Sequence, residues 1–241
     1  MTLKVLYRDD RLVAIDKPTG LLVHRSDLDR HETRFAVQEL RDQIGRAVWP
    51  VHRLDKGTSG ILLFALDAET AGLLGGQFER GEVAKQYLAV VRGLPDLEGK
   101  IDHPLGRMSD EYGYRSNSDL PQPAVTRYRR LATAELPHRV DLYPTSRYAL
   151  VELAPLSGRR HQLRRHMKHI AHPIIGDATH GKGRHNRLFQ ELFGCHRLLL
   201  AAIRLGFRHP DDGRAVVLSA PPSPDFTDCI RQLGWENQIL A

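Results

Sequence analysis

The chain has 241 residues, 41% of them hydrophobic, with 35 Lys and Arg against 29 Asp and Glu, a net charge of +6 and a pI near 9.5. This length can bury a substantial core in one large domain or two small ones, and the lack of a long apolar run excludes a membrane-spanning protein. The N-terminus passes directly into a strand pattern, so no signal peptide is expected, and Cys195 and Cys229 form neither a disulfide framework nor a metal motif. These features together predict a cytoplasmic protein.

Arginine supplies most of the positive charge, and the basic residues are clustered. Guanidinium groups suit phosphate recognition because they stay charged and donate hydrogen bonds in a planar fork. A basic pI by itself indicates nucleic acid only weakly, since many basic faces are simply solvated. The clusters are Arg127, Arg129 and Arg130; Arg159, Arg160, Arg164, Arg165 and Lys168; and Lys182, Arg184 and Arg187.

The beginning of the chain combines short strands with one helix. The helix is predicted from Thr33, which can cap it, to Gly45, which can end it, because apolar residues between them recur on one face. Strand patterns cover residues 3–7, 12–17 and 21–24.

The stretch 51–60, Val-His-Arg-Leu-Asp-Lys-Gly-Thr-Ser-Gly, is the most informative in the sequence. It leads into the apolar run 61–65, which is the pattern of a strand buried on both faces, and its glycines permit a tight turn. Asp55 therefore stands at a strand-to-turn edge beside Arg53 and Lys56, where a carboxylate can be held firmly and still reach a ligand. A polar hairpin corner with a surface ion pair would show the same pattern, so the stretch alone does not decide.

A second helix and a meander of strands follow. Asp67 can cap a helix that runs to about Arg80, and residues 83–91 predict a strand that carries Tyr87. Three further strands are predicted over residues 124–131, 140–143 and 148–153. Residues 94–122 are rich in Gly, Pro, Asp, Ser and Asn and read as a surface insertion. The same segment can be read as a substrate-gripping loop, because it mixes charged and aromatic side chains: Arg107, Tyr112, Tyr114 and Arg115.

The most basic segment, residues 159–170, predicts a helix. Its buried stripe is Leu163, Met167 and Ile170, so Arg160, Arg164 and Lys168 line up at helical spacing on another face as a basic ridge. Repelling cations at this spacing cost stability, which makes sense where an anion sits opposite them.

Histidines in and after this helix raise the possibility of a metal site. No Cys, Asp or Glu lies within the helix to complete a ligand set, and the neighbouring arginines disfavour a divalent cation. We therefore expect no metal, and a metal-dependent hydrolase, which a chelator would inactivate, is disfavoured. The histidines are His161, His166, His169, His172, His180, His185 and His196.

The C-terminal part returns to strands. Residues 178–187 are polar and basic, residues 198–207 and 214–219 predict a hairpin, and a short helix ends at Gly234. No internal repeat or linker is visible. The sequence predicts an α+β fold: one domain with a mixed, mostly antiparallel sheet flanked by helices.

His52-Arg53-Leu54-Asp55 followed by Thr58-Ser59-Gly60 resembles the catalytic motif of the pseudouridine synthases of the large-subunit and tRNA uridine group, often called the RluA type. The similarity follows the family's order over nearly the whole chain, at residues 10–24, 85–87, 158–166, 172–177 and 197–205. It implies the pseudouridine synthase catalytic fold over 1–241, without an N-terminal RNA-binding domain of the S4 type. Ala201 departs from the family, which often has His after the leucine that is here Leu200, but this change removes no catalytic group.

The resemblance implies roles for three residues. Asp55 matches the nucleophile, which attacks the target uridine and forms a covalent intermediate before the base turns and rejoins the sugar through C5. Arg164 matches the arginine that pairs with this aspartate, and Tyr87 the tyrosine that stacks on the base and helps to remove the C5 proton. A half-buried strand aromatic would also fit the pattern at Tyr87. The uridine must be flipped out of its helix, Arg53 is placed to fill the space, and no metal or organic cofactor is required.

The resemblance also indicates the partner. Residues 173–187 are most similar to the tRNA pseudouridine-65 synthases, so the expected substrate is tRNA, at uridine-65 of the T stem, with ribosomal RNA as the alternative. DNA and membranes are not expected partners, and a monomer is expected. A non-catalytic RNA-binding protein would explain the charge but not the joint match of Asp55, Tyr87 and Arg164. Leu200 is expected in the uracil pocket, and the expected RNA contacts are His52, Arg53, Thr58, Arg160, Arg165, Lys168, Lys182, Arg184 and Arg187.

Overall fold

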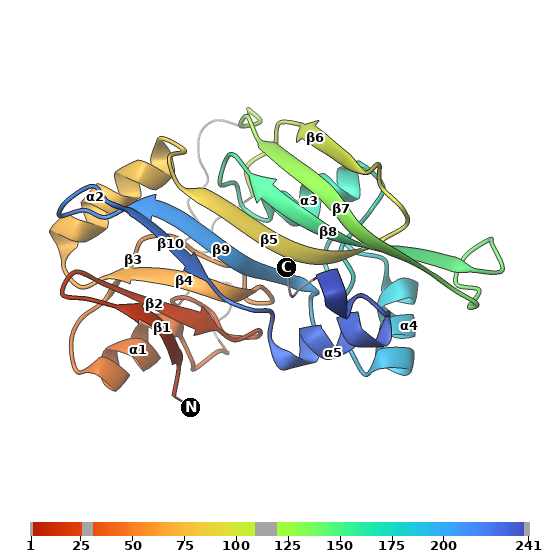
Figure 1. Cartoon of the computed structure of the whole chain (residues 1–241), viewed down its shortest axis with the longest axis horizontal. Coiled ribbons are helices and arrows are strands. Elements are labelled where there is room, and N and C mark those ends of the chain that lie inside the picture. Colours follow the sequence, from red (N-terminus) through yellow and green to blue (C-terminus); the bar gives the residue numbers. More distant parts are fainter. Residues whose placement is uncertain (1, 26–30, 109–119, 239–241) are drawn as a thin grey trace.

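A single mixed sheet forms the centre of the molecule in the computed structural model, which describes residues 2–25, 31–108 and 120–238 (Figure 1). Its ten strands run in the order β1-β2-β4-β9-β5-β8-β7-β6, with β10 beside β9 and β3 beside β4. Only the pair β4 and β9 is parallel among the pairs of named strands, which confirms the mostly antiparallel sheet. The bounds are β1 Lys4–Arg8, β2 Leu12–Lys17, β3 Trp49–Pro50, β4 Ser59–Ala65, β5 Ala84–Arg92, β6 Glu98–Asp102, β7 Val125–Leu136, β8 Ser146–Pro155, β9 Leu200–Arg208 and β10 Ala215–Ser219.

Helices cover both faces of the sheet. Alternate residues of β5 and β9 point to opposite faces, and each face is apolar where a helix packs on it. α1 and α3 pack on one face, whereas α2, α4 and α5 pack on the other. Figure 1 shows α1 and α2 towards one end of the sheet and α4 and α5 towards the other. The bounds are α1 Ala36–Ile44, α2 Ala68–Glu79, α3 Gln162–His169, α4 Gly183–Phe193 and α5 Pro224–Gln232, followed by the 3-10 turn η2 Glu236–Gln238.

β4 is the most deeply buried strand, as its apolar run predicts. All of its residues are buried, because β2 and β9 flank it and apolar clusters lie on both faces. Its parallel contact with β9 requires a glycine: a Cβ on Gly60 would lie 2.1 Å from the carbonyl oxygen of Ala202. This close approach brings the start of β4, and the turn before it, against the start of β9.

Helix ends follow the sequence signals in part. The Asp67 carboxylate caps α2 by accepting a hydrogen bond from the Thr70 N–H at 2.8 Å, and Gly45 ends α1 in the left-handed conformation, both as predicted. α1 begins later than Thr33, with Phe35 at its N-cap. Phe35 is buried and forms a bridge with Leu22, which keeps the chain extended up to that residue.

One strand prediction for the middle of the chain is wrong, and the surface insertion predicted there contains a strand. β7 and β8 form one long hairpin, so residues 140–143, predicted as a strand, lie in the turn between them and are mostly exposed. Residues 94–122 are not only a surface insertion, since β6 lies within them and pairs along β7, and Leu105 bridges to Gln122. Tyr112, Tyr114 and Arg115, expected as gripping residues, lie outside the described residues.

α4 was not predicted from the sequence, in which residues 178–187 were described only as a polar and basic segment. Its buried face depends on His185 and Phe189, which are one helical turn apart. Phe189 is fully buried and meets Tyr148 of β8 edge to face, with ring centroids 4.7 Å apart. Because most of α4's other residues are polar or charged, the helix is amphipathic, with a narrow apolar stripe.

Phe189→Ala should lower the free energy of unfolding by about 3–5 kcal/mol, because the truncation removes a fully buried ring and leaves a cavity. Urea unfolding followed by circular dichroism measures the change. Leu192→Ala on the exposed side of the same helix is the matched control and should change it by less than about 1 kcal/mol. Equal effects of the two substitutions would contradict this packing of α4.

Candidate active site

The turn that carries Asp55 is held from three sides. Its own backbone closes it, since the Asp55 carbonyl accepts a hydrogen bond from the Thr58 N–H at 3.0 Å. The Thr19 hydroxyl donates to the Gly57 carbonyl at 2.9 Å from the loop after β2. From the β9 side, Leu198 fits so closely that a Cβ on Gly57 would lie 3.1 Å from its Cβ atom. Asp55 therefore projects from a rigid turn.

Lys17, at the end of β2, is a buried ammonium beneath this turn. Its Nζ donates to the carbonyls of Leu21 at 2.7 Å, Pro18 at 3.0 Å and Lys56 at 3.3 Å, which ties the two loops together. Burial lowers the pKa of Lys17 to about 7, while the nearby Asp55 carboxylate acts to raise it. The sequence reading missed this residue; the available signal was a lysine at the end of a strand whose first four residues are apolar.

Arg164 of α3 joins two carboxylates. Its Nη1 donates to Oδ2 of Asp55 at 3.0 Å, and its Nε and Nη2 form a fork on Asp177, with both distances 2.7 Å. The guanidinium is 10% exposed and points inwards, so the predicted basic ridge is corrected: Arg164 is buried, whereas Lys168 is exposed. The anions that Arg164 faces are these two carboxylates.

Asp177 anchors this arrangement and was not singled out from sequence. Its side chain is fully buried, and it also accepts hydrogen bonds from the N–H groups of Thr179 and His180, each at 2.9 Å. Burial acts to raise the pKa of the Asp177 carboxyl, but the hydrogen bonds from Arg164 and the backbone outweigh it and lower the pKa. The preceding Gly176 is required, because a Cβ there would lie 1.8 Å from the Arg197 carbonyl oxygen.

Tyr87 lies on β5 next to these groups. Burial, and then the negative charge of Asp55, raise the pKa of its hydroxyl, so the phenol stays protonated. Its ring packs at the junction of the two apolar clusters on the α1 and α3 face, and Leu200, buried on the adjacent β9, belongs to one of them. The structure thus brings together Asp55, Tyr87, Arg164 and Leu200 from four separate elements.

Comparison with known proteins identifies the family. The sequence pattern described as RNA pseudouridylate synthase matches residues 11–169, which include Asp55, Tyr87 and Arg164. The chain belongs to the RNA pseudouridylate synthase family. It is therefore an enzyme of the isomerase class that acts on RNA.

Alignments with similar proteins extend over nearly the whole length of this synthase. A tRNA pseudouridine synthase C of Pasteurella multocida (strain Pm70) is 50% identical over 238 residues, 98% of each chain. A protein of the same name from Haemophilus ducreyi (strain 35000HP / ATCC 700724) is 50% identical over 236 residues, 98% of this chain and 97% of its own. The solved Human RNA Pseudouridylate Synthase Domain Containing 4 superposes with a TM-score of 0.72 at 26% identity, covering 96% of this chain and 93% of its own. The solved Human RNA Pseudouridylate Synthase Domain Containing 1 superposes with a TM-score of 0.71 at 28% identity, covering 95% of this chain and 87% of its own.

Most of the residues expected to contact RNA lie at the surface of the synthase. Arg160 and Arg165 are half-buried, and Nη1 of Arg165 donates to the Gly106 carbonyl at 2.9 Å. His52 and Thr58 serve the fold: His52 stacks on Phe78 and accepts a hydrogen bond from the Leu63 N–H at 3.1 Å, and Thr58 is buried. The exposed residues are Arg53, Lys168, Lys182, Arg184 and Arg187.

The histidines have local partners in several places. His166, for example, is buried, with Nδ1 2.9 Å from the Thr126 hydroxyl and Nε2 3.0 Å from the His103 carbonyl. No cluster of three or more His, Cys, Asp or Glu suited to a metal ion occurs within the described ranges. Nor is any helix of the described part long and apolar enough to cross a membrane.

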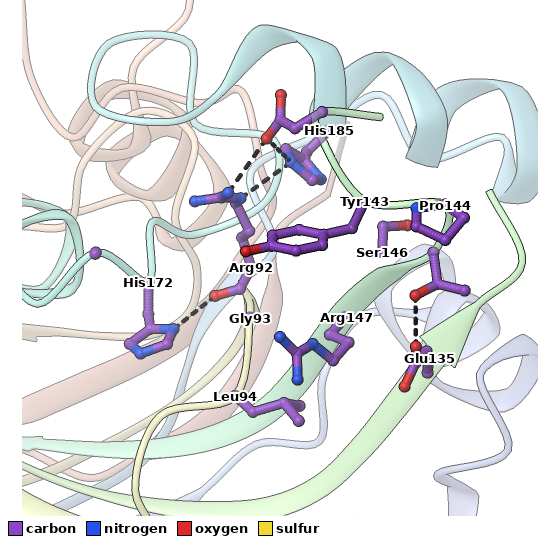
Figure 2. A pocket seen from close by; sticks show the side chains of 13 residues that line it. Arg92, Gly93, Leu94, Glu135, Tyr143, Pro144, Ser146, Arg147, His172 and His185 are labelled. Atoms are coloured by element: carbon purple, nitrogen blue, oxygen red, sulfur yellow. Dashed lines mark hydrogen bonds and ion pairs between the residues drawn. The ribbon is translucent and has the colours of Figure 1, made fainter. Parts of the chain in front are cut away.

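A separate pocket of about 440 Å³ opens at the end of β5 (Figure 2). Arg92 lines it and donates through Nε to His185 at 3.0 Å and through Nη2 to Asp141 at 3.2 Å. None of the three predicted catalytic residues contributes to its wall. The pocket is therefore distinct from the Asp55 site.

Asp177→Asn should destabilise the synthase by about 3–5 kcal/mol at neutral pH, because it leaves a buried guanidinium without its forked partner. The folded-state pKa of Asp177 lies below its unfolded value, so this carboxylate's contribution is complete above the unfolded pKa of about 3.9 and is lost as the pH falls through the folded pKa. Urea unfolding from pH 6 downwards should show the wild type approaching the variant below about pH 4. A constant gap through this range would contradict the assignment.

Proposed function

We propose that this synthase converts a uridine of tRNA to pseudouridine and that Asp55 is the nucleophile. The observation that carries the proposal is the contact of Arg164 with both Asp55 and Asp177, which leaves Asp55 as the only one of these two carboxylates that substrate can reach. The tRNA substrate is supported by the relatives named tRNA pseudouridine synthase C, which match over almost the full length.

The proposed chemistry uses the carboxylate directly. An oxygen of Asp55 forms a bond to the target uridine's sugar as the bond from the sugar to base nitrogen N1 breaks, and that electron pair leaves with the base. The base turns, its C5 forms a carbon–carbon bond to the sugar, and the bond to Asp55 breaks. The C5 proton is then lost and N1 gains a proton, so the overall reaction is an isomerisation.

Arg164 and Tyr87 prepare the site for this step. Nη1 of Arg164 orients one oxygen of Asp55 through a charge-assisted hydrogen bond. The Tyr87 ring supplies an apolar surface on which the detached base can turn. Because the Tyr87 hydroxyl stays protonated, we propose that its main role is to stack on the base, and that accepting the C5 proton is secondary.

The exposed basic residues would hold the tRNA. A uridine within a stacked helix is inaccessible, so the proposed reaction requires base flipping, with Arg53 next to the catalytic turn placed to enter the vacated space. Lys182, Arg184 and Arg187 lie together at the start of α4, where they can contact phosphates. The proposed target is uridine-65 of the T stem, and ribosomal RNA is the alternative.

Tritium release from RNA labelled at uridine C5 tests the proposal, because C5 loses its hydrogen only when it gains a new bond. Wild-type enzyme should release tritium from a tRNA transcript, and Asp55→Asn, which keeps the side-chain shape, should release none. A matched transcript with cytidine at position 65 should be inert. Release from ribosomal RNA alone would favour the alternative, and an active Asp55→Asn enzyme would exclude Asp55 as the nucleophile.

Replacing Lys182, Arg184 and Arg187 together with Ala should weaken tRNA binding at low salt. The salt dependence should become shallower, by up to about 0.9 in the slope of log K against log salt for each phosphate that the variant no longer neutralises. Filter binding across a salt series measures both the affinity and the slope. Arg231→Ala, at an exposed position paired with Asp228, is the control and should leave the slope unchanged. An unchanged slope in the triple variant would remove α4 from the RNA surface.

A further inference from the structure

His161 has an unusual backbone beside the catalytic carboxylate. It precedes α3 at the N-cap, with φ of 53°, and Ala171 is the only other non-glycine residue with positive φ in the described part of the chain. A side chain in this left-handed region costs free energy, so the surrounding contacts must hold it there. The result of this conformation is that the imidazole, 15% exposed, faces Asp55.

Two contacts define the position of the ring. Nε2 of His161 lies 4.0 Å from Oδ1 of Asp55, the oxygen that Arg164 does not contact. Nδ1 of His161 lies 3.0 Å from Nε2 of His180, and the rings meet edge to face with centroids 5.2 Å apart. The backbone of His180 is itself held, because its main-chain N–H donates to Oδ1 of Asp177 at 2.9 Å.

In the hydrogen bond between the two rings, either Nε2 of His180 or Nδ1 of His161 can be the donor. Burial lowers the pKa of both histidines, that of His161 to about 4, so each ring is neutral near pH 7 and carries one N–H. If His180 donates, Nδ1 of His161 accepts and its Nε2 carries the hydrogen that faces Asp55. If His161 donates instead, its Nε2 lone pair faces the carboxylate, which is electrostatically unfavourable.

We propose that His161 is a positioning residue that restrains Oδ1 of Asp55 through its Nε2–H, and that His180 acts through it by fixing this tautomer. The inference rests on the proposed function, because it assumes that Asp55 is the reacting group. Arg164 and His161 would then control the two oxygens of Asp55 separately. The distance of 4.0 Å is longer than a hydrogen bond, and we expect it to shorten when bound RNA excludes water from the site.

The matched pair His180→Gln and His180→Met tests the role of the donor. The two side chains are similar in shape, but only the Gln amide can donate to Nδ1 of His161. We expect His180→Met to lower the single-turnover rate of tritium release about 10- to 100-fold with unchanged tRNA affinity, the effect of losing one hydrogen bond to a charged group. His180→Gln should restore most of the lost rate. Equal rates in the two variants, or a lower affinity as the only effect of Met, would overturn the inference.

The tautomer can be measured without a substitution. Two-bond ¹H–¹⁵N correlation spectra of the histidine-labelled wild-type enzyme should show His161 with its hydrogen on Nε2, and a hydrogen on Nδ1 would overturn the inference even if His180→Met does not fold. Failure of the wild type to release tritium would instead count against the proposed function. The two failures are therefore distinguishable.

Discussion

The buried guanidinium of Arg164 is the constraint on which the site depends. It connects α3 and the segment that follows α3 to the turn before β4, which lies far away in sequence. A buried cation is costly unless its hydrogen bonds are satisfied, and Asp177 and Asp55 satisfy three of them. Well-packed apolar side chains can stabilise a core equally well, so the charged arrangement is better explained by the need to hold Asp55, the carboxylate that we propose reacts.

The two carboxylates differ only in their surroundings. Asp177 is fully buried, and its oxygens accept hydrogen bonds from Arg164 and two backbone N–H groups. Asp55 is 25% exposed, is bonded by Arg164 at one oxygen, and projects from a turn that Lys17 holds from below. One aspartate is thereby structural, while the other keeps an oxygen available for chemistry.

Local patterns predicted the parts of the structure whose cause is local. The apolar run 61–65 specifies a buried strand whatever its neighbours are, and Asp67 caps α2 through a residue three positions later. By contrast, Asp177 and Lys17 matter through tertiary contacts, with Arg164 of α3 and with the Lys56 carbonyl respectively, and helix or strand periodicity does not reveal such contacts. β6 (Glu98–Asp102) was not predicted because most of its side chains are charged, and it forms a strand by pairing with β7. The prediction of a basic ridge on α3 was wrong because helical spacing cannot show that the Arg164 side chain points inwards to Asp55 and Asp177.

The most direct test is the turnover of Asp177→Asn, a residue that the substrate need not touch. Single-turnover tritium release and tRNA affinity should be measured on the folded variant at pH 7. If Arg164 holds Asp55 in its reactive position only while Asp177 holds Arg164, the rate should fall at least about tenfold while affinity stays within about twofold. A wild-type rate in the folded variant would show that Asp55 reacts without this support and would contradict the central claim.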